Sequence, residues 1–309
     1  MMARTCLSRL SRCSQWRKFG ETTMGVRSPC YLTMSHATTA SSNQSTYQVT
    51  PLGPCLGVEV RGLDLRTCEG GQLFEEIDSL IGEHLVVCFR CQGAMTPQDQ
   101  IRFTELWGAV EPHPLGSRAD SHPADIPREV MVAQNTMTKA SARTVRNDIW
   151  HTDLSCMERP VGLSMLRALE VPPPGWGDTM FANMQKAWET LTPSLRETVV
   201  WMNAVHNTAH FEGADSKETF TKSASNVHPV VRTHPKTGRH ALYLSGNFIH
   251  NFEGMTRDES LPLLQKLISH ATVPANVYRH RWQQADFVVW DNRATMHYAV
   301  FDYEPGQKR

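Results

Sequence analysis

Short runs of β-type residues, separated by turns rich in Gly and Pro, make up most of the chain after about residue 128. The runs cover Glu129–Val132, Gly162–Val171, Ala241–Leu244, Val277–Trp282, Phe287–Asp291 and Tyr298–Tyr303. They show no regular βαβ alternation, and no internal repeat links them. Many short strands with few helices indicate a mainly β protein, with a β-sandwich or jelly-roll core and helices packed outside it.

Two strands and one amphipathic helix are predicted before this β-rich part. Gly57–Leu65 alternates between apolar and polar residues, and His84–Arg90 is an apolar run, so both predict strands and the second is expected to be buried. Between them, Gln72–His84 has the spacing of an amphipathic helix. Its apolar face consists of Leu73, Ile77, Leu80 and Ile81.

Capping signals place three further helices. Thr96–Pro97 begins one of them, with Thr as N-cap and Pro at the first helical position, and Gly108 ends it. Its inward-facing residues are expected to be Phe103, Leu106 and Trp107. Thr192–Pro193 begins the next helix, and Thr256 with Glu259 three residues later forms a capping box for the last.

The first 46 residues differ in composition from the rest of the chain. Before Met34 there is a single acid, Glu21, and serines are interleaved with six basic residues: Arg4, Arg9, Arg12, Arg17, Lys18 and Arg27. Such a segment is typical of a mitochondrial or chloroplast transit peptide, and the alternatives are a disordered extension or a working start at Met34. Residues 35–46 form a polar linker. We therefore expect a leader and linker over 1–46, one domain over 47–309, and an organellar location if the leader is real or a cytoplasmic one otherwise.

Charge and composition exclude several classes of protein. Lys plus Arg and Asp plus Glu both total 31, whereas nucleic-acid-binding proteins usually carry a basic excess or patch. No run approaches the eighteen apolar residues of a membrane span, and no P-loop is present. Eight cysteines are too few for a disulfide scaffold, so we expect a reducing compartment. Cys88 and Cys91 form an isolated CxxC pair beside a buried strand and are interpreted as two core thiols.

Histidine is abundant, with 14 copies, and this directs attention to metal or acid–base chemistry. Non-haem Fe(II) oxygenases bind their metal through two His and one carboxylate on one face, which leaves three coordination positions open. The sequence motif typical of such a site is His-x-Asp or His-x-Glu, because one turn can direct both side chains at one ion. The chain has two such pairs, His151 with Asp153 and His210 with Glu212. One residue in ten is acidic, so chance would supply one or two pairs, and spacing alone does not choose between them.

Seven spaced motifs do choose between them. They are Val49-Thr-Pro-Leu-Gly-Pro, Gly62-Leu-Asp-Leu, Trp107-Gly-Ala-Val-Glu-Pro-His-Pro, Trp150-His-Thr-Asp, Gly177-Asp-Thr, His228-Pro-Val-Val-Arg-Thr-His-Pro-Lys-Thr-Gly and Trp290-Asp-Asn-Arg-Ala-Thr-Met-His-Tyr. Together they resemble the taurine dioxygenase/chlorophenoxyacetate dioxygenase (TauD/TfdA) family of Fe(II)- and 2-oxoglutarate-dependent oxygenases. The resemblance extends over residues 49–309.

The resemblance implies a double-stranded β-helix (jelly-roll) core with flanking helices. By matching position, it implies that His151, Asp153 and His297 are the iron ligands and that the pair His210 and Glu212 is a decoy. It further implies an oxidoreductase that consumes 2-oxoglutarate and O2, hydroxylates a C–H bond of a small organic substrate, and releases succinate and CO2.

Binding residues follow from the same matching positions. Thr179 and Arg309 are expected to hold the C5 carboxylate of 2-oxoglutarate, for which Arg is the preferred charge-assisted partner. His113, Asn147 and Phe248 match positions that line the substrate pocket. The substrate class left open by the resemblance includes anions that bear a sulfonate or a carboxylate.

Two alternatives stay open at this point. The chain ends at Arg309, where a family member continues for another strand or so, and this favours a truncated, catalytically impaired jelly-roll protein with a binding or regulatory role. A zinc enzyme that uses the same three ligands is the other alternative. The expected partners are a small-molecule substrate and, in a homo-oligomer, further copies of the chain, but neither a nucleic acid nor a membrane.

Overall fold

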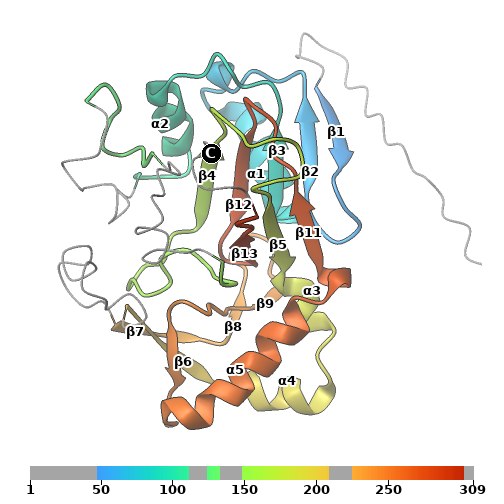
Figure 1. The fold of residues 1–309 in the computed structure, drawn as a ribbon, viewed down its shortest axis with the longest axis vertical. Coiled ribbons are helices and arrows are strands. Elements are labelled where there is room, and N and C mark those ends of the chain that lie inside the picture. Colours follow the sequence, from blue (N-terminus) through green and yellow to red (C-terminus); the bar gives the residue numbers. More distant parts are fainter. Residues whose placement is uncertain (1–46, 111–123, 133–147, 209–224, 303–309) are drawn as a thin grey trace, which may run out of the picture. The chain divides into compact units, whose positions relative to one another are not determined.

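A five-stranded sheet supports the fold in the computed structural model, which describes residues 47–110, 124–132, 148–208 and 225–302 (Figure 1). In spatial order its strands are β1 (Gln48–Pro51), β2 (Val58–Arg61), β3 (Val86–Phe89), β12 (Phe287–Asp291) and β4 (Leu163–Arg167). Neighbours are antiparallel except β2 and β3, which are parallel. A parallel pair needs a crossover, and here it contains helix α1 (Gly71–His84).

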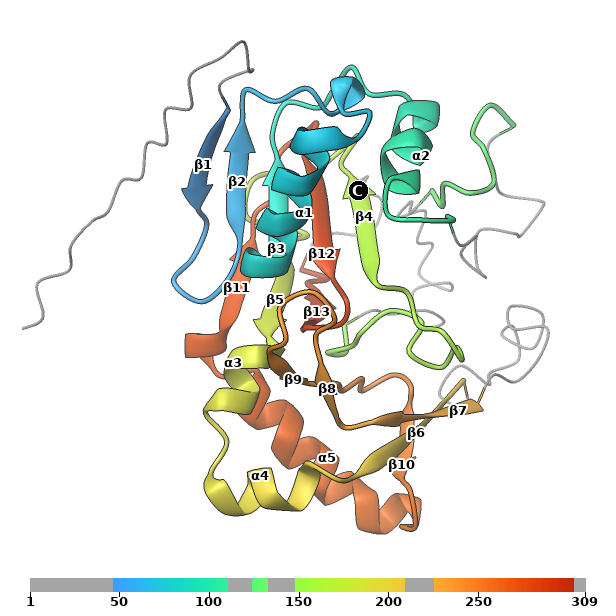
Figure 2. The same ribbon diagram turned by 180° about the vertical axis from the view of Figure 1, so that it is seen from behind.

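The two central strands of this sheet are buried on both faces. Because successive side chains of a strand point to opposite faces, Val86 and Val288 enter one apolar core while Val87 and Val289 enter another. The second core lies under α1 and α2 (Pro97–Glu105), where Phe103 packs edge-on against Phe287 at 5.6 Å between ring centroids. Figure 2 shows α1 lying across β3 on this side. The uninterrupted apolar run of β12 is therefore a consequence of its burial between two layers.

A second, three-stranded sheet faces the first across the other core. Its order is β11 (Val277–His280), β5 (Thr179–Asn183) and β13 (Thr295–Ala299), and all pairs are antiparallel. Phe181 of β5 lies 5.7 Å from Trp290 of β12 between ring centroids, so the two sheets meet through these side chains. This face-to-face arrangement confirms the predicted jelly-roll core.

The remaining elements form the part drawn below these sheets in Figure 1. A third sheet has the order β10 (Ile249–Phe252), β6 (Asn203–Asn207) and β7 (Ser225–Pro229), and β8 (Val231–Thr233) pairs with β9 (His240–Leu242). Helix α5 (Arg257–Ala271) packs on β10 and on α3 (Met184–Glu189), and α4 (Pro193–Val199) precedes β6. Two 3-10 turns, Leu65–Thr67 and Pro274–Asn276, complete the described elements.

Most predicted elements are confirmed, but two strands are not where the sequence placed them. Glu129–Val132 belongs to a turn, in which the Val130 amide donates to the carbonyl of Pro127 at 3.0 Å. The run Tyr298–Tyr303 was placed too late, because β13 covers Thr295–Ala299. The connection from β12 is tighter than expected, since the Ala294 amide already donates to the carbonyl of Asp291.

The interpretation of the CxxC pair is half wrong. Cys88 is fully buried in β3, as predicted. Cys91 is exposed and has a φ of 63°, because the chain turns away from the sheet immediately after β3. The pair therefore contributes one core thiol, not two.

Candidate metal centre

Two histidines far apart in the sequence become neighbours through one antiparallel β-bridge. The His151 amide donates to the carbonyl of His297 at 3.0 Å, and the His297 amide donates back to His151 at 2.8 Å. Residues that exchange both hydrogen bonds lie directly opposite each other, so their side chains project from the same face. The two imidazole rings accordingly lie 4.1 Å apart between centroids.

Asp153 completes the group from the turn that begins two residues after His151. Its Oδ1 atom lies 3.7 Å from His151 Nε2 and 3.5 Å from His297 Nε2. Two ligands at right angles around an ion, each about 2.1 Å from it, would lie about 3 Å apart. The three donors therefore fit one metal ion with little adjustment, and two imidazoles with one carboxylate are the ligand set of non-haem Fe(II) sites.

The intervening residue fixes this segment in place. Thr152 is buried, and its hydroxyl lies 3.1 Å from the carbonyl oxygen of Leu244 and 3.0 Å from that of Thr295. Leu154, directly after Asp153, has a φ of 46°, which few non-glycine residues adopt. Both features limit the ligand-bearing stretch to three residues.

A hydrogen bond orients one imidazole of the centre, and burial keeps the other neutral. His151 Nδ1 lies 2.6 Å from the carbonyl of Ile149, so Nδ1 carries the proton and the lone pair of Nε2 points at the other ligands. Burial lowers the pKa of His297 to about 3, against opposing attraction from Asp153. Because a metal competes with the proton for the imidazole, a histidine that stays neutral is suited to bind one.

Thr179 lies at the start of β5, on the same face of its sheet as the centre. In the register of β5 and β13, Phe181 is opposite His297 and Thr179 is opposite Ala299. Thr179 therefore lies two residues, or about 7 Å along the strand, from Phe181, the residue opposite His297. The Trp282 indole donates to the Thr179 hydroxyl oxygen at 3.0 Å and so fixes its position.

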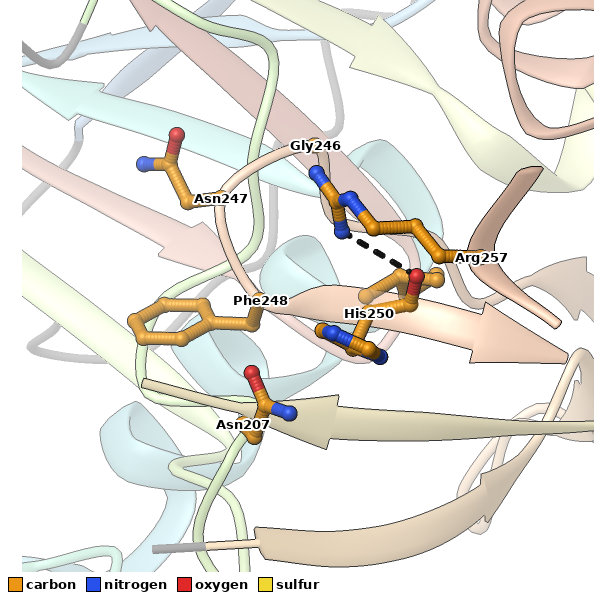
Figure 3. A pocket seen from close by; sticks show the side chains of 7 residues that line it. Asn207, Gly246, Asn247, Phe248, His250 and Arg257 are labelled. Carbon is orange, nitrogen blue, oxygen red and sulfur yellow. Dashed lines mark hydrogen bonds between the residues drawn. The ribbon is translucent and has the colours of Figure 1, made fainter. Parts of the chain in front are cut away.

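Phe248 lines a cavity of about 360 Å³ together with other residues of the segment 246–250 (Figure 3). Gly246, one of these residues, donates to the carbonyl of Trp150 at 2.9 Å, and a Cβ at this glycine would lie 2.7 Å from the Ile149 side chain. Arg257, from the start of α5, also lines the cavity and donates to the His250 carbonyl at 3.2 Å. The cavity thus lies directly beside the residues that precede His151.

Several predicted site residues lie outside the described part of the chain. These are His113, Asn147 and Arg309, together with the decoy pair His210 and Glu212. The structure thus brings together His151, Asp153 and His297, places Thr179 on the same face, and sets Phe248 in the adjoining cavity.

Sequence reasoning missed two residues that hold the carboxylate ligand. Ser164 of β4 donates to Asp153 Oδ2 at 2.7 Å, and Asn292 donates to the Ser164 hydroxyl oxygen at 2.7 Å. Asn292 lies in the recognised Trp290 motif, which was the available signal. Ser164 carries no local signal, because its role depends on the pairing of β4 with β12.

A second group of ligand-type side chains, Cys88, His280 and Asp286, is fully buried elsewhere in the described structure. Asp286 accepts a hydrogen bond from Arg90 at 2.6 Å, and the Tyr278 hydroxyl lies 3.0 Å from His280 Nδ1. Burial raises the pKa of the Cys88 thiol well above its usual range. The carboxylate is already paired with a guanidinium, and the thiol stays protonated. We therefore interpret the group as an internal polar network, not as a metal site.

Comparison with known proteins shows which family the chain resembles. Residues 48–309 match the profile of the family described as "Taurine catabolism dioxygenase TauD, TfdA family". The chain is 32% identical over 284 residues to an alpha-ketoglutarate-dependent sulfate ester dioxygenase of Pseudomonas putida, covering 87% of this chain and 90% of that protein. It is 31% identical over 261 residues to an alpha-ketoglutarate-dependent 2,4-dichlorophenoxyacetate dioxygenase of Cupriavidus pinatubonensis, covering 80% and 90%.

A solved structure has a similar fold. The chain superimposes on AAD-2 in complex with Mn(II) and N-oxalylglycine with a TM-score of 0.68, at 27% identity, over 85% of this chain and 94% of that one. The family match, the relatives named for alpha-ketoglutarate and the triad together imply Fe(II), 2-oxoglutarate and O2 as cofactor and cosubstrates. This chain belongs to the TauD/TfdA family of 2-oxoglutarate-dependent dioxygenases.

Proposed function

We propose that the chain binds Fe(II) through His151, Asp153 and His297 and hydroxylates a small organic anion. The observation that carries this proposal is the β-bridge, which sets two imidazole nitrogens close to one carboxylate oxygen. When bound there, Fe(II) with 2-oxoglutarate and O2 supplies the oxidising power for the C–H bond, and succinate and CO2 are released. The protein has to hold the ligands, orient the cosubstrate and place the substrate.

Thr179 is suited to bind the C5 carboxylate of 2-oxoglutarate. It lies on the face of the sheet that carries His297, and the contact with the Trp282 indole holds its hydroxyl in place. The hydroxyl would donate to the carboxylate while the metal centre receives the other end of the cosubstrate. Arg309 remains the proposed charged partner on sequence grounds.

The cavity beside the ligand segment is suited to bind the substrate, with Phe248 as an apolar wall and Arg257 as the cation. Within the described structure, Arg257 makes one hydrogen bond and no ion pair, so most of its five N–H donors are available to an anion. The two relatives described above are named for a sulfate ester and for an aryloxyacetate, both of which are anions. A guanidinium binds either group in two-pronged geometry.

The test is substrate-dependent succinate formation with an alkyl sulfate, a phenoxyacetate, an alkanesulfonate and a neutral alcohol of similar size. An anion should stimulate turnover while the neutral compound does not. Arg257→Gln should raise KM for that anion roughly tenfold with little change in kcat, since a charged hydrogen bond contributes about 1.5–3 kcal/mol.

Arg239→Gln is the matched control, because Arg239 is exposed in the turn between β8 and β9, outside the cavity. Equal turnover of the neutral compound, or an unchanged KM in Arg257→Gln, would contradict the assignment of the anion site. No succinate from any compound, despite intact metal binding, would favour the alternative of a catalytically impaired protein of the same fold.

A further inference from the structure

The two oxygens of the Asp153 carboxylate have different surroundings. Oδ1 faces the Nε2 atoms of His151 and His297 at 3.7 and 3.5 Å. Oδ2 accepts a hydrogen bond from Ser164 Oγ at 2.7 Å. One oxygen is thus directed at the metal position, and the other is engaged by the protein.

Asn292 fixes the direction of the Ser164 hydroxyl. Its side-chain amide donates to Ser164 Oγ at 2.7 Å, and because a hydroxyl has a single proton, that proton is directed to Asp153. The other end of the same amide, Oδ1, lies 3.4 Å from the backbone nitrogen of Asp153. Asn292 therefore acts on Asp153 in two ways, indirectly through the Ser164 hydroxyl and directly at the backbone nitrogen of Asp153.

Rigid elements support both residues of this arrangement. Ser164 lies opposite Trp290 in the pairing of β4 with β12, and Asn292 follows the last residue of β12. The Asn292 amide nitrogen of the main chain donates to the carbonyl of Gly162, two residues before Ser164. Asn292 is itself buried, so its side chain has little freedom to reorient. The hydrogen bonds to Asp153 are consequently built into the sheet.

We propose that Ser164 and Asn292 hold Asp153 as a ligand through one oxygen only, and so keep a coordination position open for the cosubstrate. Carboxylates bind metals through one or both oxygens. With two histidines and one carboxylate oxygen, three of six positions stay open, two for a chelating cosubstrate and one for O2, whereas a carboxylate bound through both oxygens would compete for one of these three. This inference rests on the proposed iron site and assigns Ser164 and Asn292 as positioning residues for it.

The prediction separates metal binding from cosubstrate binding. In Ser164→Ala, the carboxylate is free to turn its second oxygen to the ion, so Mn(II) affinity should stay within about threefold of the wild type. The affinity of the Mn(II)-loaded protein for N-oxalylglycine, an unreactive analogue of 2-oxoglutarate, should fall roughly 10- to 100-fold. Ser164→Thr, which keeps the hydroxyl, should restore it, and Asn292→Ala should resemble Ser164→Ala.

Both affinities are measured by calorimetry, and the Co(II)-loaded proteins are compared by visible absorption, which reports a change in coordination number. Parallel loss of metal and analogue affinity in Ser164→Ala, or no loss of analogue affinity in either variant, would overturn the inference. Failure of the proposed function is distinguishable, because then His151→Ala would bind Mn(II) as tightly as the wild type.

Discussion

At the scale of single residues, His206 shows that a buried histidine is not always a ligand. Its Nδ1 lies 2.9 Å from the Ser155 hydroxyl, and its Nε2 has no hydrogen-bond partner within the described structure. Burial, together with the nearby His228 and Arg232, lowers the pKa of His206 to about 3. Between about pH 6.5 and pH 3 the unfolded chain therefore binds a proton here that the folded chain does not, and stability falls as pH falls.

We predict that His206→Gln weakens this pH dependence. Between pH 7 and pH 5, His206 should lower the free energy of unfolding of the wild type by roughly 2 kcal/mol, and the variant should lose less by that amount. Urea unfolding of the metal-free proteins at both pH values measures the difference. His240→Gln, at an exposed position in β9, is the control and should behave as the wild type. If His206→Gln and wild type lose the same free energy of unfolding, the low pKa of His206 is refuted.

The ligand set could be predicted from sequence because its members lie in recognisable local motifs. Ser164 could not, because the residue that orients its hydroxyl, Asn292, lies 128 residues away, and only the pairing of β4 with β12 brings the two together. Cys91 was misjudged for a related reason, since a turn with a positive φ leaves no sign in the CxxC spacing. The role of a residue cannot be predicted from local sequence when it depends on contacts with residues distant in the chain.

At the scale of secondary-structure elements, two helices that both begin after a threonine differ in the hydrogen bonds of that residue. Thr256, the N-cap of α5, accepts from the Glu259 amide, and Glu259 reaches back to the Thr256 amide. Thr192, the N-cap of α4, makes no side-chain hydrogen bond to its helix. The capping box predicted at Thr256 is therefore confirmed, and the cap at Thr192 rests on backbone geometry and Pro193.

This difference predicts unequal costs for the same substitution. Thr256→Ala should lower the free energy of unfolding by about 1 kcal/mol, since it leaves amide donors of the first turn without a partner. Thr192→Ala should cost less than about 0.5 kcal/mol, because no side-chain bond is lost. Chemical denaturation of both variants checks the contrast. Equal losses would show that the two caps contribute alike.

Element boundaries were predictable where burial was two-sided. β12 has the bounds that its apolar run indicated, because both faces lie in a core and every position is apolar up to Asp291. Glu129–Val132 was misassigned because a short run of similar residues is equally compatible with a turn after Pro127. The strand and the turn differ in burial, which the spacing of apolar residues indicates only indirectly.

At the scale of the whole molecule, the class of fold followed from the many short strands, whereas the order of strands did not. β12 pairs with β3 and β4, which precede it by more than a hundred residues, and nothing local indicates these partners. Among the described residues, no helix combines the length and apolarity needed to cross a bilayer. The absence of a nucleic-acid partner and the homo-oligomer stay predictions from sequence.

We propose, on sequence grounds alone, that residues 1 to about 33 act as a targeting segment. An acid-poor leader rich in Arg and Ser offers little apolar surface for a core. Deleting it should leave the melting temperature and succinate formation unchanged, and should move a fluorescent fusion out of an organelle. A drop of several degrees in melting temperature would show instead that the segment packs on the domain.

The central claim is that His151, Asp153 and His297 hold one Fe(II) ion to which 2-oxoglutarate binds. Anaerobic titration of the Fe(II)-loaded protein with 2-oxoglutarate tests it, because chelation of the ion by the cosubstrate produces a weak visible charge-transfer band. The wild type and His240→Ala should develop the band at one equivalent of iron, and His151→Ala, Asp153→Ala and His297→Ala should not. A wild type without the band, or a triad variant that keeps it at full intensity, would contradict the account.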